Sequence, residues 1–268
     1  MNGISDSKTW IPQLTDKNGI VRSNRDEVLE VAAEFYENLY KSTLTEDQRD
    51  GLSPDLNDDT AVDEISIREV EQSIKMMKKA KAIGTDEISS DLFKICDILG
   101  LEHLRFIFNE ILITEDVPKQ WLESTIVLIY KKKGDRKNIK NYRPIMITSH
   151  LYKLFMRILL NRLDNKLNKH QPCNQAGFRT GYSTIDHIFV VNQLIEKSNE
   201  YNKPLFMGFI DYEKAFDSIE HPFLWSALKE HEVESKYIRI FKKIYENSQT
   251  RIKMDKYSRC FRIGRGIK

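Results

Sequence analysis

The chain has 268 residues, of which 40% are hydrophobic and 31% charged, so a wholly disordered protein is excluded and one large domain or two small ones are possible. Forty-two basic and 40 acidic residues give a formal net charge of +2, which is no argument for a polyanionic partner. The basic residues are nevertheless clustered. One cluster contains Lys75, Lys78, Lys79 and Lys81, and the other contains Lys131, Lys132, Lys133, Arg136, Lys137, Lys140 and Arg143. Each cluster is suited to phosphate contacts, and each is also compatible with a solvated surface.

Neither secretion nor membrane insertion is expected. The start MNGISDSKTWIPQL lacks a basic region followed by an apolar core, and no apolar stretch approaches about 20 residues. Cys96, Cys173 and Cys260 are too far apart for a zinc-knuckle pattern, so we expect reduced structural thiols. These features favour an intracellular protein, either cytoplasmic or nuclear.

Residues 1–60 are predicted to form an N-terminal arm, a helix and an acidic linker. Pro12 and the Asn18-Gly19 turn signal favour a short hairpin or an irregular arm in the first 24 residues. Apolar residues then recur at helical spacing over residues 26–39. The acidic stretch 41–63, which contains a glycine and a proline, is typical of a solvated linker.

Helical spacing of apolar residues continues through most of the remaining chain. It predicts helices over residues 66–81, 91–113, 151–163, 184–200, 221–231 and 236–247. Ser66 and Glu69 form a capping box at the start of the first of these helices. The second is expected to break near Gly100, and Pro118 to stop helical structure.

Two apolar runs predict buried strands. Residues 124–130, STIVLIY, are rich in β-branched and aromatic side chains and lead into the basic loop KKKGDRKNIKNYRP. After this loop, Thr148 or Ser149 is placed to cap the following helix. A second strand is predicted at residues 205–211, LFMGFID, and a hairpin is predicted around Asp255-Lys256.

Asp211 follows the second apolar run directly, and a carboxylate at such a position must be offset by another group. A divalent cation is a natural candidate, since phosphoryl-transfer sites hold two metals about 3.5–4 Å apart with carboxylates. Asp217 would lie roughly 20 Å away along an extended chain, and its place before Pro222 favours a helix cap. From the residues alone, Asp211 is either a metal ligand or a cap.

FIDYEKAFDSIEH resembles the first palm motif of reverse transcriptases encoded by non-LTR (LINE-like) retrotransposons. Three segments resemble the same family in the same order, namely KKAKAIGTDEISSDLFK, STIVLIYKKKGDRKNIKNYRPIMITSHLYKLFMRILLNRL and QAGFRTGYSTIDHI. The first departs from the family at Ile83 or Thr85, where the family often has proline beside the glycine. The resemblance implies an α+β fold from about residue 61, with helix-rich fingers (about 61–200) and a partial palm (about 201–268) of a right-hand polymerase whose palm sheet is incomplete.

The resemblance also implies roles for individual residues. Asp211 corresponds to the first catalytic, metal-binding aspartate, with the carbonyl of Tyr212 beside it. Phe216 corresponds to a steric-gate aromatic facing the position of a ribonucleotide 2′-hydroxyl, although an ordinary core phenylalanine fits the same pattern. Lys131 and Arg143 correspond to residues that grip the incoming triphosphate, as a point charge and a bidentate fork respectively.

Gln175, Phe178 and Arg179 correspond to a motif near the template or primer, and a structural role fits them almost as well. The implied cofactor is Mg²⁺, and the implied partners are an RNA template, a DNA primer and deoxynucleoside triphosphates. In the family, a stretch like GRGIK leads into Gln-Gly-Asp and later into a Tyr-Ala-Asp-Asp hairpin with the remaining catalytic aspartates.

The sequence ends at Lys268, before either of these motifs. We therefore expect a fragment of an RNA-directed DNA polymerase, truncated after the first palm motif, with weak or absent Mg²⁺ binding and no polymerase activity alone. The alternatives are a non-catalytic nucleic-acid-binding remnant of a transposon polyprotein and an expressed fragment with no selected role. Apolar surface near residues 205–210 is expected to remain uncovered, which favours aggregation or partial disorder there.

Overall fold

The computed structural model describes residues 10–179 and 181–267. The elements in chain order are β1 (Leu14–Thr15), β2 (Val21–Arg22), α1 (Arg25–Tyr40), α2 (Glu46–Leu52), α3 (Ile67–Met76), α4 (Ser90–Phe93), α5 (Ile98–Thr114), α6 (Lys119–Leu122), β3 (Glu123–Tyr130), the 3-10 helix η1 (Ile139–Asn141), β4 (Tyr142–Ile147), α7 (His150–His170), α8 (Thr184–Glu200), α9 (His221–Glu230), α10 (Ser235–Glu246), β5 (Gln249–Lys253) and β6 (Phe261–Arg262). This mixture of helices and sheet agrees with the expected α+β class. The first nine residues of the N-terminal arm, Thr180 and Lys268 lie outside the described residues.

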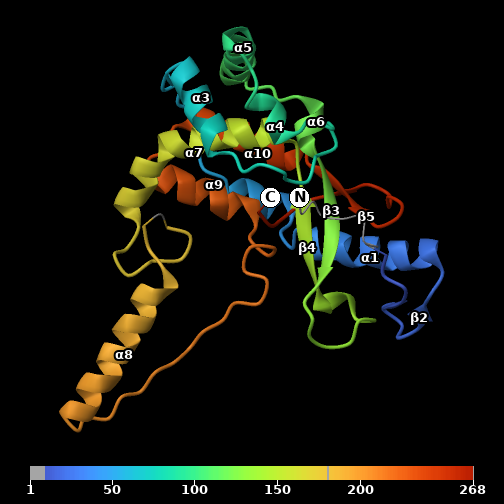
Figure 1. Cartoon of the computed structure of the whole chain (residues 1–268), viewed down its shortest axis with the longest axis vertical. Helices are drawn as coiled ribbons and strands as arrows, with labels where there is room; N and C mark the ends of the chain where they lie inside the picture. Colours follow the sequence, from blue (N-terminus) through green and yellow to red (C-terminus); the bar gives the residue numbers. More distant parts are fainter. Residues whose placement is uncertain (1–9, 180, 268) are drawn as a thin grey trace.

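A four-stranded sheet in the order β4-β3-β5-β6 lies beside α1 (Figure 1). Strand β3 runs antiparallel to β4 and parallel to β5, and β5 runs antiparallel to β6. Ile126 of β3 and Ile252 of β5 are buried in one core with the apolar stripe of α1. Arg143 and Ile145 on β4 are exposed. One face of β4 is therefore covered by α1, and the other is left open.

A second core joins α3, α5, α7, α9 and α10. Phe155 of α7 lies between Phe108 and Trp121, with ring centroids 5.4 Å apart in both pairs. Arg162 of α7 fastens this core to the start of α3, because its Nη2 donates to Glu69 Oε2 at 3.0 Å and to a neighbouring backbone carbonyl. Together with the capping box of Ser66 and Glu69, which is formed as predicted, this contact fixes the angle between α3 and α7.

Several predicted boundaries shift because local hydrogen bonds compete with the helix. The helix predicted over residues 66–81 ends at Met76, since the Lys94 ammonium takes the Met77 carbonyl at 2.6 Å. The helix break expected near Gly100 lies at Asp97 instead. Asp97 is the N-cap of α5, and its side chain accepts a hydrogen bond from the Gly100 N–H. Pro118 precedes the short helix α6.

The stretch predicted as a solvated acidic linker is fixed to the body of the protein. It contains the helix α2, which begins at a capping box. Arg239 of α10 donates to the carbonyls of Leu56 and Asp58. The Asp58 carboxylate accepts from Lys229 and Ser235, each at 2.7 Å. The domain boundary near residue 60 stays a prediction, although residues on both sides of it contact the same helices.

The strand predicted at residues 205–211 is not formed, and this prediction is wrong. Phe206 and Phe209 are 89% and 85% exposed. A strand needs a neighbouring strand to pair its backbone groups and a partner for its apolar face, and the described residues provide neither at this position. The expected uncovered apolar surface at residues 205–210 is confirmed.

Helix α8 has the predicted bounds and a capping box of Ser183 and Asp186, yet none of its described residues is buried. Ile185 and Phe189 are exposed. Figure 1 shows α8 projecting away from the rest of the molecule and the chain returning to α9 as an extended segment. The apolar stripe of this helix therefore has no partner within the described part of the chain.

The two predicted hairpins are present, whereas the predicted role of the cysteines is not confirmed. The hairpin around Gly19, whose φ of +80° suits glycine, and the hairpin near Asp255-Lys256 are present. The three cysteines are free, but Cys173 and Cys260 are exposed, so they are not the structural thiols expected of a core. In the described part of the chain, none of the helices has both the length and the apolar character needed to cross a bilayer.

Candidate nucleotide and nucleic-acid site

The basic loop between β3 and β4 is held by its own hydrogen bonds. The Lys131 N–H donates to the Asn141 carbonyl at 2.8 Å, and the Tyr142 hydroxyl donates to the Arg136 carbonyl at 2.8 Å. Gly134 has φ +81°, and a Cβ there would lie 2.5 Å from the side chain of Asn141. The turn therefore requires glycine at this position, and the loop is a preformed structure rather than a flexible tether.

Cationic side chains surround this loop and remain in contact with solvent. The exposed members are Lys131, Lys132, Lys133, Arg136, Lys137 and Lys140. The Lys131 ammonium donates to the Lys140 carbonyl at 2.8 Å, which keeps it at the base of the loop. Arg143 follows on β4 opposite Ile129, on the open face of the sheet. Lys131 and Arg143, both predicted to grip a triphosphate, are thus accessible at the loop end of the β3-β4 hairpin.

The segment that carries Asp211 is fastened at its far end to α1 and to the C-terminal strand region. The Tyr40 hydroxyl of α1 donates to Asp217 Oδ1 at 3.1 Å. The Ile267 N–H donates to the Phe216 carbonyl at 2.9 Å. Burial raises the pKa of Tyr40, and the neighbouring Asp217 carboxylate raises it further, so the hydroxyl keeps the proton that it donates. These contacts fix Phe216 and Asp217 relative to the sheet.

The predicted cap role of Asp217 is wrong, because Glu220 is the N-cap of α9. Glu220 is buried and accepts from the Ser42 hydroxyl at 2.7 Å and from the Thr43 N–H and hydroxyl, each at 2.8 Å. Burial alone would raise the Glu220 pKa, but these hydrogen bonds outweigh it and hold the pKa below its usual value. Asp217 is still structural, as the partner of Tyr40.

Lys214 of the palm motif packs on α1 and lines one cavity with Lys140 of the basic loop. Its ammonium lies 4.9 Å from the centroid of the Phe35 ring on α1. Burial lowers the Lys214 pKa, and the positive charges of Lys140 and Lys131 lower it further against the opposing carboxylates nearby. No local pattern predicts this contact, because Phe35 and Lys214 lie far apart in the chain.

Two aromatic residues singled out from the sequence meet in space. The rings of Phe178 and Phe216 lie 5.0 Å apart at 83°, an edge-to-face arrangement. Phe216 is 51% exposed and Phe178 is 92% exposed, so neither is an ordinary core residue. Phe178 also has φ +60°, which is uncommon for a bulky side chain. The contact brings the loop before α8 against the palm motif and leaves both rings accessible.

The other two residues assigned to the template or primer make local contacts. The Gln175 amide donates to the Gly177 carbonyl at 3.2 Å. Arg179 donates to the Pro172 carbonyl at 3.1 Å, and its guanidinium lies 4.6 Å from the centroid of the Tyr182 ring. These contacts shape their own loop, so the predicted nucleic-acid role of Gln175 and Arg179 stays a prediction.

Asp211 and Tyr212 are exposed at the start of the motif. No hydrogen bond or ion pair of the Asp211 side chain is formed with the described residues. Across the described residues, no group of three or more histidine, cysteine, aspartate or glutamate side chains is placed to hold a metal ion. The residues present therefore do not fit a two-metal site, which needs several carboxylates about one pair of cations.

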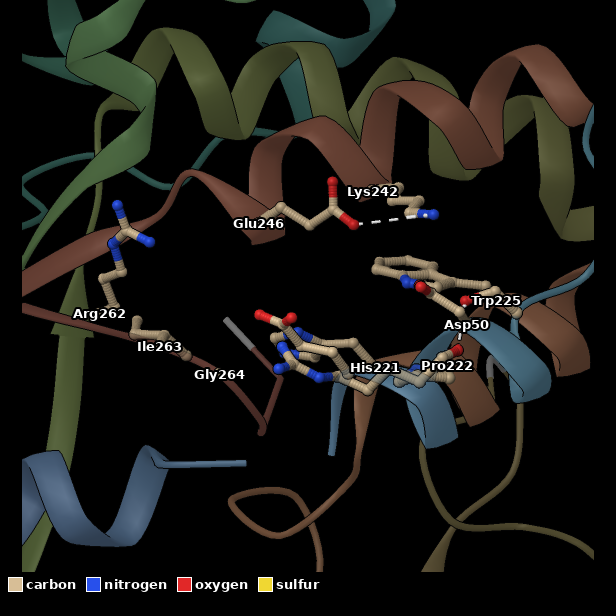
Figure 2. A pocket seen from close by; sticks show the side chains of 12 residues that line it. Asp50, His221, Pro222, Trp225, Lys242, Glu246, Arg262, Ile263 and Gly264 are labelled. Carbon is tan, nitrogen blue, oxygen red and sulfur yellow. Dashed lines mark hydrogen bonds and ion pairs between the residues drawn. The ribbon is translucent and has the colours of Figure 1, made fainter. Parts of the chain in front are cut away.

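A separate cavity of about 380 Å³ lies between α2, α9, α10 and β6 (Figure 2). Its lining includes three carboxylates and three cationic side chains, namely Glu46, Asp50, Glu246, Arg49, Lys242 and Arg262. The Lys242 ammonium and the Glu246 carboxylate form an ion pair at 3.7 Å, which a dashed line marks in Figure 2. Because its charges offset one another, this cavity is poorly suited to an anionic ligand.

Comparison with known proteins identifies the family. A family model described as reverse transcriptase (RNA-dependent DNA polymerase) matches residues 130–264, half of the chain. The chain is 30% identical over 192 residues to a probable RNA-directed DNA polymerase from transposon BS of Drosophila melanogaster, covering 71% of the chain and 21% of that relative.

Two further relatives agree with this match. The RNA-directed DNA polymerase from mobile element jockey of Drosophila melanogaster is 31% identical over 162 residues, covering 59% of the chain and 18% of the relative. The transposon TX1 uncharacterized 149 kDa protein of Xenopus laevis is 23% identical over 271 residues, covering 98% and 21%. The chain spans about a fifth of the length of the relatives it matches. It belongs to the reverse transcriptase (RNA-dependent DNA polymerase) family, with relatives among the polymerases of non-LTR retrotransposons.

Proposed function

We propose that this chain is the substrate-gripping part of an RNA-directed DNA polymerase of the right-hand type, comprising fingers and part of a palm. In this proposal, Lys131 and Arg143 bind the triphosphate of a deoxynucleotide, and Phe216 faces its sugar. Asp211 contributes one ligand to Mg²⁺ when further carboxylates are supplied. RNA template and DNA primer lie along the open face of β4 and against the loop that carries Phe178.

The proximity of the basic loop and the palm motif carries this proposal. Lys214, three residues after Asp211, lines one cavity together with Lys140 of the basic loop, and Phe216 contacts Phe178. Segments that are far apart in the sequence therefore lie near the palm motif, and together they present exposed cations and exposed aromatic rings. Such a surface suits a ligand with a polyanionic end and a ring system.

Nucleotide binding tests the proposal without requiring polymerisation. A fluorescent deoxynucleoside triphosphate is titrated with the chain and with the variants Lys131→Gln and Arg143→Gln. Because hydrogen bonds to charged groups contribute about 1.5–3 kcal/mol, each substitution should weaken binding about tenfold or more. Lys169→Gln and Arg68→Gln, which remove exposed charges elsewhere, are the matched controls. Equal affinities for all four variants would contradict the proposal.

Polymerase activity is a separate question. The described residues form no group of three or more metal-ligating side chains around Asp211, so we propose that this chain alone does not extend a primer on an RNA template in Mg²⁺ or Mn²⁺. Incorporation that disappears in Asp211→Ala would show that the metal site is complete within the chain.

A non-catalytic nucleic-acid-binding role is the second candidate. It is favoured by the basic loop, whose exposed cations are held on a backbone that is fixed by its own internal hydrogen bonds. Each neutralised single-strand phosphate contributes about −0.7 to the slope of log affinity against log salt, so Lys132→Gln/Lys133→Gln/Lys137→Gln should reduce the slope by about 2. An unchanged slope would exclude the loop as the binding surface.

A further inference from the structure

Two histidine rings meet where helices α7 and α9 end. His170 is the last residue of α7, and His231 is the C-cap of α9. Their ring centroids lie 5.0 Å apart and their planes are tilted by 59°, so the rings do not stack face to face. Figure 1 shows α7 and α9 running side by side. The proposed nucleotide site uses neither histidine.

The nitrogen atoms of this pair are available to a ligand. His170 is exposed and His231 is partly exposed. The His231 Nδ1 lies 2.7 Å from the Ala227 carbonyl and so carries the donated proton, which makes its Nε2 an acceptor in the neutral ring. Histidines that ligate a metal ion commonly donate their other ring N–H to a backbone carbonyl in this way. The His170 side chain forms no hydrogen bond or ion pair with the described residues.

The turn after α9 holds the two rings at this separation. Lys166 lies one turn before His170 on the same face of α7. Its ammonium forms an ion pair with the Glu234 carboxylate and donates to the Glu232 carbonyl at 3.4 Å. Val233, between these two residues, is 1% exposed and anchors the turn in the core. The distance between the histidines is therefore set by the fold itself.

This separation matches that of two ligands of one transition-metal ion. Zn²⁺ lies about 2.0–2.1 Å from an imidazole nitrogen, so two imidazoles on one tetrahedral ion have centroids roughly 5 Å apart. Imidazole suits Zn²⁺, Cu²⁺ and Ni²⁺, whereas Mg²⁺ prefers oxygen ligands. The pair therefore favours a different class of ion from the one proposed for Asp211.

Glu234 provides a second observation at the same turn. One of its oxygens pairs with Lys166, while Oε2 is buried and has no hydrogen-bond partner among the described residues. A buried carboxylate oxygen without a partner is costly, and a cation nearby would lower that cost. The described residues do not bring Glu234 and the two histidines together as three ligands, so this carboxylate would act on the ion through its charge.

We propose that His170 and His231 bind a divalent transition-metal ion such as Zn²⁺, with water in the remaining coordination positions. The ion joins the last turn of α7 to the end of α9. The loop that carries Phe178 leaves α7 directly after His170, so the bound ion also fixes the start of this loop. The site is a cross-link between two helices and is separate from Asp211.

The test is a titration of the whole chain, first stripped of metal by a chelator, with Zn²⁺ alone in competition with a zinc-sensitive dye. One ion should bind per chain. His170→Ala and His231→Ala should each weaken binding about 10–100-fold or more, because the loss of a partner behind a metal ligand already has an effect of this size. Zn²⁺ should also raise the midpoint of thermal unfolding of the original chain but not of these variants.

Two control variants separate this site from other zinc ligands. His103→Ala is the matched control, because His103 on α5 is exposed and makes the same 2.7 Å contact from Nδ1 to a backbone carbonyl, with no described histidine ring against it. Cys173→Ser removes an exposed thiol three residues after His170. Both variants should bind Zn²⁺ as tightly as the original chain does.

Equal weakening in all three histidine variants, or in none of them, would overturn the assignment. Binding that is lost in Cys173→Ser but kept in His231→Ala would overturn it as well, because the ion would then lie on the thiol. If a variant fails to fold, the imidazole nitrogen resonances of the original chain decide. Zn²⁺ should shift those of His170 and His231 and leave those of His103 in place, and unshifted resonances of the pair would contradict the proposal.

Discussion

Removal of the Glu220 carboxylate should loosen the end of the palm motif from the segment that follows α1. Glu220 is 8% exposed and accepts three hydrogen bonds of 2.7–2.8 Å from Ser42 and Thr43. Hydrogen bonds to a charged group contribute about 1.5–3 kcal/mol each, but the two partners lie near the surface and can turn to water after the substitution. We therefore expect Glu220→Ala to lower the free energy of unfolding by about 2–3 kcal/mol.

The stabilisation by Glu220 should decrease as the pH falls. The folded-state pKa of Glu220 lies below its ordinary value of 4.5. Its contribution is therefore fully present above that value and is lost as the pH falls through the folded pKa. The difference in unfolding free energy between the original chain and Glu220→Ala should be full at pH 7 and shrink below about pH 4.

Denaturant unfolding at pH 7 and below about pH 4 measures the difference in unfolding free energy between the original chain and Glu220→Ala. Hydrogen exchange at the Thr43 amide reports the same contact locally. Glu230→Ala, at an exposed position on the same helix, is the matched control. If Glu220→Ala costs no more than this control at pH 7, or the same amount at both pH values, the reasoning is refuted.

Three further substitutions test other contacts. Gly84→Ala should destabilise the chain by about 1–3 kcal/mol in denaturant unfolding, because its Cβ would lie 2.8 Å from the Thr148 backbone; Gly51→Ala, where nothing lies within 4 Å, is its control. Tyr40→Phe should lower the free energy of unfolding by about 1 kcal/mol and speed hydrogen exchange at the Ile267 amide, which binds the neighbouring Phe216 carbonyl. Unchanged exchange would show that the Tyr40 hydrogen bond does not hold Asp217 in place. Phe189→Lys on α8 should change unfolding by less than about 0.5 kcal/mol and improve solubility, and a large loss of stability would show that this face is covered.

Local signals in the sequence were sufficient for most elements. The capping box of Ser66 and Glu69 and the cap at Ser149 depend on residues three or fewer positions apart, and both are formed. The β-branched run before the basic loop predicted β3, because this strand has neighbours on both sides. Periodicity also placed α8 correctly, although it could not reveal that the apolar stripe would remain exposed.

The failures concern contacts that no local pattern encodes. The run at residues 205–211 has the composition of a strand, but a strand exists only when a partner pairs with it. Helix α3 ends earlier than predicted because the Lys94 ammonium, 17 residues along the chain, binds the carbonyl of the C-cap residue Met77. Family motifs identified Phe178 and Phe216 separately, while their contact and the anchoring of Lys214 on Phe35 depend on tertiary packing.

Photo-crosslinking with an azido-deoxynucleoside triphosphate tests most directly whether the basic loop and the palm motif form one nucleotide site. After digestion, mass spectrometry locates the modified peptides. The proposed site predicts crosslinks within residues 131–143 and 212–216, which excess unlabelled deoxynucleoside triphosphate suppresses and which Arg143→Gln weakens. Labelling confined to other segments, such as those around the cavity of Figure 2, would contradict the account.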